Sequence, residues 1–437
     1  MKNISKTTYH NLLFFSSLLL LLIPFALISG PFLGDLFISI LGLIYLFIII
    51  KNGNFKILNF FYVKLFIFFF IYLSIRAIFS DNLILSLKPS ITYIRFGLFS
   101  LMMLYIFKNV ENFTRNFYIG LIIALCVLIF DGYFQFFTGK NIFGFAQTRP
   151  TRLGGLFFDE LILGSYISRI LPLVVTLSFL NKKILSKNYL IILVTLSYLL
   201  VFLSGERAAF FLITFYFILI LPFLLNLKKL IALSALMIIF FGTIISLNEK
   251  LKSRYVEQLS MHLFKHDEYN SYQSYYVSDQ KKLFMPEHRG LFVASIAIFQ
   301  KNILFGTGVK TFRVECDNLD SDLVIKWRKI MQNINFCNTH PHNYYLQLLS
   351  ETGLIGFLFV SILFLKLIFN YFVQLNVLFK KNKKINLSYI CALSAFIITI
   401  WPLTTSGSFF NNWVCSTIFL TIGVYLFIIF YDSKKIL

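Results

Sequence analysis

Long apolar stretches recur through almost the whole chain, and they restrict the fold more than any other feature of the sequence. A helix needs about 20 apolar residues to cross a bilayer, and we count twelve stretches near that length. Only 14% of the residues are charged, against about 25% in soluble domains, so a water-soluble enzyme is excluded. The stretches are residues 11–29, 32–50, 58–79, 89–107, 117–137, 161–180, 188–204, 208–225, 229–247, 343–373, 386–404 and 409–431.

The first stretch follows Lys2 and Lys6, as the apolar core of a signal peptide does. It lacks a clear small-residue cleavage site, and Gly30-Pro31 leads straight into the next apolar run. We therefore expect it to be retained as a span. The sequence predicts an all-α integral membrane protein with about twelve transmembrane helices.

The basic residues give an orientation. Cytoplasmic loops are enriched in Lys and Arg. With the N-terminus inside, the turns on that side hold 18 basic residues against two acids, Glu111 and Asp432. Both termini are therefore predicted to be cytoplasmic. The net charge of +21 then indicates contact with anionic membrane lipids or phosphate groups, and nucleic acid is not expected as a partner.

One long polar segment, residues 248–342, interrupts the short turns between spans nine and ten. Nine predicted spans precede this segment, so a cytoplasmic N-terminus places it on the opposite side of the membrane, in the periplasm of a Gram-negative cell. Loops of this length usually carry function. Leu291 to Leu304 within it read as an amphipathic helix, which suits the bilayer surface. The predicted organisation is therefore helices one to nine in 1–247, the periplasmic loop domain in 248–342, and helices ten to twelve in 343–437.

Two of the five cysteines, Cys316 and Cys337, lie in the periplasmic loop. An oxidising compartment favours a disulfide between them. In the chain-entropy model a bridge across about 20 residues contributes on the order of 3 kcal/mol. The alternative is two free thiols.

The segment from Thr339 to Gly356 is the most informative for chemistry. Thr339 is suited to capping a helix that begins at Pro341, which would place His342 in the first turn at the outer boundary of the membrane. A neutral imidazole there can accept a proton near pH 7. The competing reading is an interfacial histidine that only forms hydrogen bonds.

Arginines gather in three other places on the predicted outer side, where the charge rule disfavours them. Arg149 and Arg152 lie before the sixth span, Arg207 in the turn between spans seven and eight, and Arg289 near the start of the amphipathic helix. Guanidinium groups at helix starts suit phosphate. Snorkelling, or neutralisation by nearby acids, is the alternative for each of them; those acids are Asp159, Glu160, Glu206 and Glu287.

The sequence contains none of the familiar metal-binding or nucleotide-phosphate motifs. His340 and His342 are two residues apart, so they would not share a helix face. We therefore expect a metal-independent mechanism and no cofactor.

These segments resemble the superfamily of O-antigen ligases and O-antigen polymerases, bacterial inner-membrane transferases of lipid-linked glycans. The layout of about twelve spans with one large loop is also similar. The resemblance is carried by residues 149–157, Ser204 to Arg207, Arg289 to Phe312 with its Gly306-Thr307-Gly308, His340 to Gly356, and Ser406 to Trp413.

The resemblance implies undecaprenyl-diphosphate-linked glycans as donors. Carried onto this chain, it makes His342 the general base and Arg207 and Arg289 the holders of the diphosphate, with inversion at the anomeric carbon. Arg149 and Arg152 are expected to join the diphosphate site. Residues expected to support the base are His340, Asn343 and Glu351.

The sequence leaves two possible acceptors for the glycan. A ligase transfers the glycan to the lipid A core, which we prefer, and a polymerase transfers it to another lipid-linked glycan. A transporter or flippase of lipid-linked sugars is a different possibility. It would need a polar path, yet ionisable residues such as Asp131 and Lys366 are few in the spans. A non-catalytic assembly protein is the remaining alternative.

Overall fold

The computed structural model describes residues 6–53, 55–263, 286–319, 337–380 and 385–431, together with positions 322 and 325. These residues form helices joined by turns, with two isolated β-bridges and no strand within the described ranges. The described part of the chain is thus all-helical, as predicted.

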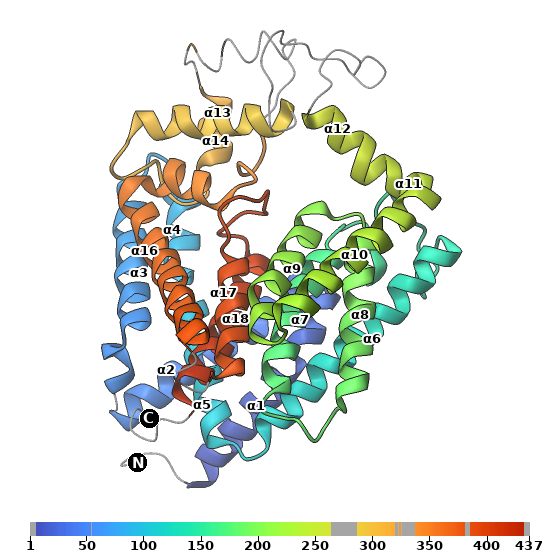
Figure 1. Ribbon diagram of the computed structural model, residues 1–437. Coiled ribbons are helices and arrows are strands. Elements are labelled where there is room, and N and C mark those ends of the chain that lie inside the picture. Colours follow the sequence, from blue (N-terminus) through green and yellow to red (C-terminus); the bar gives the residue numbers. More distant parts are fainter. Residues whose placement is uncertain are drawn as a thin grey trace.

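Most of the apolar helices follow one another with short connections (Figure 1), except at residues 139–162 and at the long loop between α10 and α16. Their bounds are α1 Lys6–Ser29, α2 Pro31–Asn52, α3 Phe61–Ile78, α4 Leu83–Thr92, α5 Ile94–Asn109, α6 Phe113–Thr138, α7 Leu163–Ser178, α8 Lys187–Leu203, α9 Arg207–Ile220, α10 Leu227–Leu247, α16 Tyr344–Lys380, α17 Leu387–Thr399 and α18 Asn412–Phe430. The shorter helices of the long loop are α11 Glu249–Lys252, α12 Gln258–Leu263, α13 Pro286–Lys301 and α14 Phe312–Asp317, with a π-helical turn at Ser253–Glu257.

Each of the twelve predicted stretches overlaps one of these helices. The fourth stretch overlaps two, α4 and α5, which meet at Tyr93. Within the described residues, eight helical segments are long and apolar enough to cross a membrane. The helices α7, α8, α9 and α17 are shorter. The structure is therefore that of a multi-pass membrane protein, and the count of twelve spans stays a prediction.

The helices stand side by side as a bundle, and α13 lies across one end of it (Figure 1). Helices α3, α4 and α16 form one side of the bundle, and α6, α8 and α10 form the other. The start of α1 and the end of α18 both lie at the end opposite α13.

The longest helix, α16, is interrupted at Gly353, where φ is 64° and ψ is −169°. That backbone region is essentially restricted to glycine, and the interruption frees main-chain groups from the helix. Residues 303–308, which follow α13, bond to these groups. The bonds run from Leu354 N–H to Ile303 C=O (2.8 Å), Ile355 N–H to Leu304 C=O (3.2 Å), Thr307 N–H to Ser350 C=O (3.2 Å) and Gly308 N–H to Glu351 C=O (2.8 Å).

Arg76 of α3 holds the same segment from the other side. Its Nε lies 3.1 Å from the carbonyl oxygens of both Phe305 and Gly306, and its Nη2 donates to Gly306 at 2.6 Å. The Tyr72 hydroxyl donates to the carbonyls of Phe305 and Thr352 at 3.2 and 2.5 Å. A buried arginine in an apolar helix is costly unless its donors are satisfied, and here main-chain carbonyls satisfy them.

The amphipathic helix is present as α13, which begins and ends earlier than the predicted Leu291–Leu304. Its apolar face is not free for the bilayer. Leu291, Ala294 and Ile298 are buried in a small core with Phe312 and Cys316 of α14. The helix is therefore anchored to α14 as well as to α16.

Replacing Gly353 by alanine should disrupt the join between α16 and the loop. An added Cβ would overlap the backbone of Leu304 and Gly306, on top of a backbone strain of about 1–3 kcal/mol. Gly53 is the matched control, because it also has a positive φ of 62° but nothing within 4 Å of its Cβ position. In detergent thermal-unfolding assays, Gly353→Ala should lose several degrees more than Gly53→Ala; equal losses would contradict the insertion.

Candidate active site

The segment before α16 differs from the prediction in its capping. Thr339 does not cap a helix beginning at Pro341; that prediction is wrong. The helix begins at Tyr344, and the side chain of Asn343 accepts hydrogen bonds from the N–H groups of Tyr345 and Leu346, each at 3.0 Å. His342 therefore precedes the helix instead of lying in its first turn.

The loop between α17 and α18 fixes this segment in place. The Asn343 side-chain amide donates to the carbonyls of Pro402 (2.8 Å) and Thr404 (3.3 Å), and the Ser406 N–H donates to the His342 carbonyl at 2.9 Å. His342 adopts a φ of 55°, which is uncommon for a residue other than glycine. These long-range bonds hold it there, and they account for the helix starting later than predicted.

Three imidazoles meet at this point. The ring centroids of His340 and His342 are 4.2 Å apart, and those of His288 and His342 are 5.3 Å apart. The expectation that His340 and His342 would be separated was based on a helix that is not formed. His288 comes from α13, and the sequence analysis did not select it.

Burial lowers the pKa of all three histidines and so favours the neutral imidazole. Burial, followed by the neighbouring His342 and then Arg207, lowers the pKa of His288 to about 4. Burial and His342 also lower the pKa of His340 to about 4. The pKa of His342 is lowered by burial, against the effect of the Ser406 carbonyl, which accepts a hydrogen bond from the ring. A neutral imidazole keeps a lone pair on one ring nitrogen. Asn338 Nδ2, an amide donor, lies 3.3 Å from Nε2 of His342, so an acceptor hydroxyl that uses this nitrogen would displace the Asn338 side chain.

Arginines from three separate segments gather beside the imidazoles. Arg207 is the first residue of α9 and Arg152 belongs to the loop before α7. Arg254, which the sequence analysis did not select, follows α11. Burial, then repulsion by Arg207 and Arg152, lowers the pKa of Arg254 to about 10. We call Arg149, Arg152, Arg207 and Arg254 the first cationic group.

Main-chain carbonyls and one amide orient these guanidinium groups. Arg254 donates to the Gly205 carbonyl (2.9 Å) and to the Gln258 side chain (2.8 Å), and Arg152 donates to the Leu161 carbonyl (2.6 Å). Arg207 Nη1 is buried and lacks a hydrogen-bond partner among the described residues. This arrangement leaves cationic donors for an anionic ligand.

Glu206 does not neutralise the first cationic group as a whole. Its carboxylate accepts from the N–H groups of Gly164 (2.6 Å) and Ser165 (3.2 Å) at the start of α7, and from the Ser165 hydroxyl (2.7 Å). It reaches Arg152 only at 4.0 Å. Burial raises its pKa. Glu206 thus acts mainly as a cap for the start of α7. It does not pair with Arg207 or Arg254, so it leaves their positive charges without neutralisation by this carboxylate.

Arg149 and Arg289 were also predicted to bind the diphosphate, and the structure gives fewer contacts for these two arginines than for the others. Arg149 is exposed and acts electrostatically on Arg152 and Arg254. Arg289 lies in the first turn of α13, next to His288, and its side chain is outside the described part of the structure.

Glu351 is buried in α16 and faces the inserted loop. It accepts hydrogen bonds from the N–H groups of Lys310 (2.8 Å) and Phe312 (3.3 Å) and from the Gln347 side chain (3.1 Å). Gln347 in turn donates to the Ser408 hydroxyl at 2.9 Å. Glu351 therefore joins α14, α16 and the outer turn before α18, and it has no contact of its own with the imidazoles.

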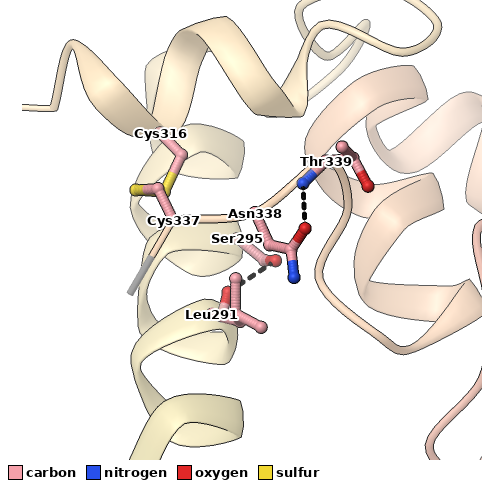
Figure 2. Close-up of a disulfide and its surroundings, with 6 residues drawn as sticks. All are labelled: Leu291, Ser295, Cys316, Cys337, Asn338 and Thr339. Carbon is pink, nitrogen blue, oxygen red and sulfur yellow. Dashed lines mark hydrogen bonds between the residues drawn. A yellow bond between two sulfur atoms is a disulfide. The ribbon is translucent and has the colours of Figure 1, made fainter. Parts of the chain in front are cut away.

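Cys316 and Cys337 are bonded to each other, with their Cα atoms 5.7 Å apart (Figure 2). The bridge links the end of α14 to the segment that leads into His340. Asn338 and Thr339 follow it directly, and the Thr339 N–H donates to the Asn338 side chain at 2.6 Å. The disulfide thus restrains the chain just before the histidine segment.

Fold and site together define an all-helical membrane protein with imidazoles and guanidinium groups gathered at one end of the bundle. The sequence model of the O-antigen ligase family matches residues 191–361. The match supports the resemblance to the superfamily of O-antigen ligases and polymerases that the motifs indicate. The matched range includes Arg207, Arg254, His288 and His342. Comparison with curated proteins finds no match.

The disulfide can be tested by thiol labelling. Because the two sulfurs are bonded, a variant lacking the other cysteines (Cys126, Cys391 and Cys415 replaced by serine) should take up no maleimide without reductant. After reduction and unfolding it should take up two equivalents. Labelling of the folded, unreduced variant would contradict the bridge.

Proposed function

We propose that the protein is a glycosyltransferase that moves a glycan from undecaprenyl diphosphate to an acceptor hydroxyl at the periplasmic face of the bacterial inner membrane. The observation that carries this proposal is that three neighbouring imidazoles lie beside Arg207, a member of the first cationic group, at one end of a membrane bundle. His288 connects the imidazoles to the arginines, because its ring lies next to that of His342 and Arg207 acts on it electrostatically.

In the proposed reaction, His342 takes the proton of the acceptor hydroxyl while that oxygen attacks the anomeric carbon. The bond to the diphosphate oxygen breaks, and the configuration inverts. Negative charge on the leaving diphosphate grows during this step, so Arg207 and Arg254 would stabilise the transition state more than the bound substrate. The activated donor supplies the free energy, and no metal or cofactor takes part in the proposed reaction.

The acceptor distinguishes the two reactions of the superfamily. Transfer to the lipid A core would make the protein a ligase, the preference drawn from the sequence, and transfer to a second lipid-linked glycan would make it a polymerase. Cells without the gene would carry lipid A core without glycan if the protein is the ligase, and core with a single repeat unit if it is the polymerase.

Replacing His342 by glutamine should lower glycan transfer by about 10²–10⁴-fold, because general-base catalysis contributes that much. The measurement is transfer from a lipid-linked donor by purified protein in proteoliposomes. His10→Gln is the matched control, since His10 is exposed on α1 at the opposite end of the bundle. Undiminished transfer by the His342 variant would rule out this base.

Replacing Arg207 by alanine should lower transfer by about 10²–10³-fold, the usual cost of losing one such donor. Lysine should restore little, because it lacks the planar pair of donors that binds phosphate in two places. Arg115→Ala, an exposed arginine of α6, serves as the control. Full rescue by Arg207→Lys would indicate a simple point charge instead.

A further inference from the structure

One imidazole of the site, that of His288, has no role in the reaction proposed above. It lies in the first turn of α13, where its ring centroid is 5.3 Å from that of His342 and 6.5 Å from that of Phe292. Phe292 follows four residues later and so lies on the same face of the helix. The ring of His288 is therefore placed by two contacts, one within its own helix and one to the base.

Buried nitrogens without partners occur on both sides of the contact between α13 and α9. Nδ1 of His288 and Nη1 of Arg207 are among them, and neither has a hydrogen-bond partner within the described residues. Arg207 also acts on His288 electrostatically. An unpaired buried nitrogen is costly, and such a group in a folded protein requires an explanation. One ligand with several acceptor oxygens would supply a partner for each nitrogen.

No acid among the described residues forms an ion pair with Arg207. Glu206, which precedes it, accepts its hydrogen bonds from Gly164 and Ser165 at the start of α7. Arg254 interacts with Arg207 electrostatically and adds a further positive charge. A ligand suited to this place is therefore an anion that accepts hydrogen bonds from both buried nitrogens.

His288 can bind an anion without adding charge to the site. Burial, followed by His342 and Arg207, lowers the pKa of His288 to about 4, so at neutral pH the ring has one N–H, which either nitrogen can carry. A further positive charge beside Arg207 and Arg254 would add repulsion, whereas a neutral N–H adds a hydrogen bond alone. Hydrogen bonds to an ionised acceptor such as phosphate are stronger than those between neutral groups.

We propose that His288 binds the donor diphosphate through an N–H at Nδ1, beside Arg207. The inference rests on the proposed function and adds an uncharged donor to a site of guanidinium groups. When the bond to the anomeric carbon breaks, its electron pair stays on the diphosphate oxygen, and the proton of the acceptor hydroxyl goes to His342. His288 gains and loses no proton. Its hydrogen bond strengthens as negative charge grows on the diphosphate.

Two amide replacements test the position of this donor. The amide nitrogen of asparagine is attached to Cγ, as Nδ1 is, whereas that of glutamine lies further out, as Nε2 does. The probe is undecaprenyl diphosphate, titrated into the purified protein in nanodiscs and measured by native mass spectrometry. His288→Asn should bind it within about threefold of the wild type, and His288→Gln and His288→Leu about 10–100-fold more weakly, the usual effect of losing a hydrogen bond to a charged group. Gln300→Leu is the control, since Gln300 is exposed on the same helix.

Equal binding by the wild type, His288→Gln and His288→Leu would overturn the inference. Equal losses in the asparagine and glutamine variants would also overturn it, because they would show that the role requires the imidazole ring. If the leucine variant does not fold, as judged by thermal unfolding in detergent, the comparison of the two amides still decides. A wild-type protein that binds no undecaprenyl diphosphate would instead contradict the proposed function.

Discussion

The hydrogen bonds between the broken helix α16 and the segment 303–308 are the constraint on which the outer end of the bundle depends. In a bilayer, main-chain groups must find partners within the protein, and the break at Gly353 leaves several without helical partners. The loop supplies them, and Arg76 satisfies the remaining loop carbonyls. The segment that follows α13 is thereby fixed to α16 by its backbone, so its position depends little on the identity of most side chains.

This attachment positions the proposed chemistry. Helix α13 leads into the inserted segment, α14 follows it, and the disulfide joins α14 to the residues before His340. His288 on α13 and His342 before α16 are therefore brought together from opposite ends of one fixed unit. The loop after α17 completes the arrangement through Asn343 and Ser406. Burial opposes protonation of all three imidazoles, and the neighbouring His342 also lowers the pKa of His288 and His340; the neutral form that burial favours is the one that a general base requires.

Much of the helical layout could be predicted from hydropathy, because each apolar stretch folds into a helix whose main-chain groups form hydrogen bonds with each other. Arg152 and Arg207 were selected from the sequence because basic residues are disfavoured on the predicted outer side, and in the structure the two act on each other electrostatically. The predicted cap at Thr339 was wrong because competing hydrogen bonds come from residues 402–406, more than 50 positions away in the sequence. A local sequence motif does not reveal such distant partners. Arg254 was missed since the long loop holds many basic residues. Arg76 had a usable signal, an arginine within an apolar stretch.

The motifs themselves divide into two kinds. Gly306-Thr307-Gly308 and the stretch from Glu351 to Gly356 resemble functional sequences, but their polar groups are bonded to each other across the break in α16. His342, Arg207 and Arg254 are different, since the ring of His288 lies next to His342, Arg207 acts on His288 electrostatically, and Arg254 interacts with Arg207. A sequence pattern alone does not separate these cases, because both require particular residues at fixed spacing.

The most direct measurement is a structure of the protein in a lipid nanodisc with a non-cleavable lipid-diphosphate donor analogue. The account predicts diphosphate density within hydrogen-bonding distance of Arg207 and Arg254, with the anomeric carbon facing His342. Density for the diphosphate at the opposite end of the bundle, or at the α13 end but beyond the reach of His342, would contradict it.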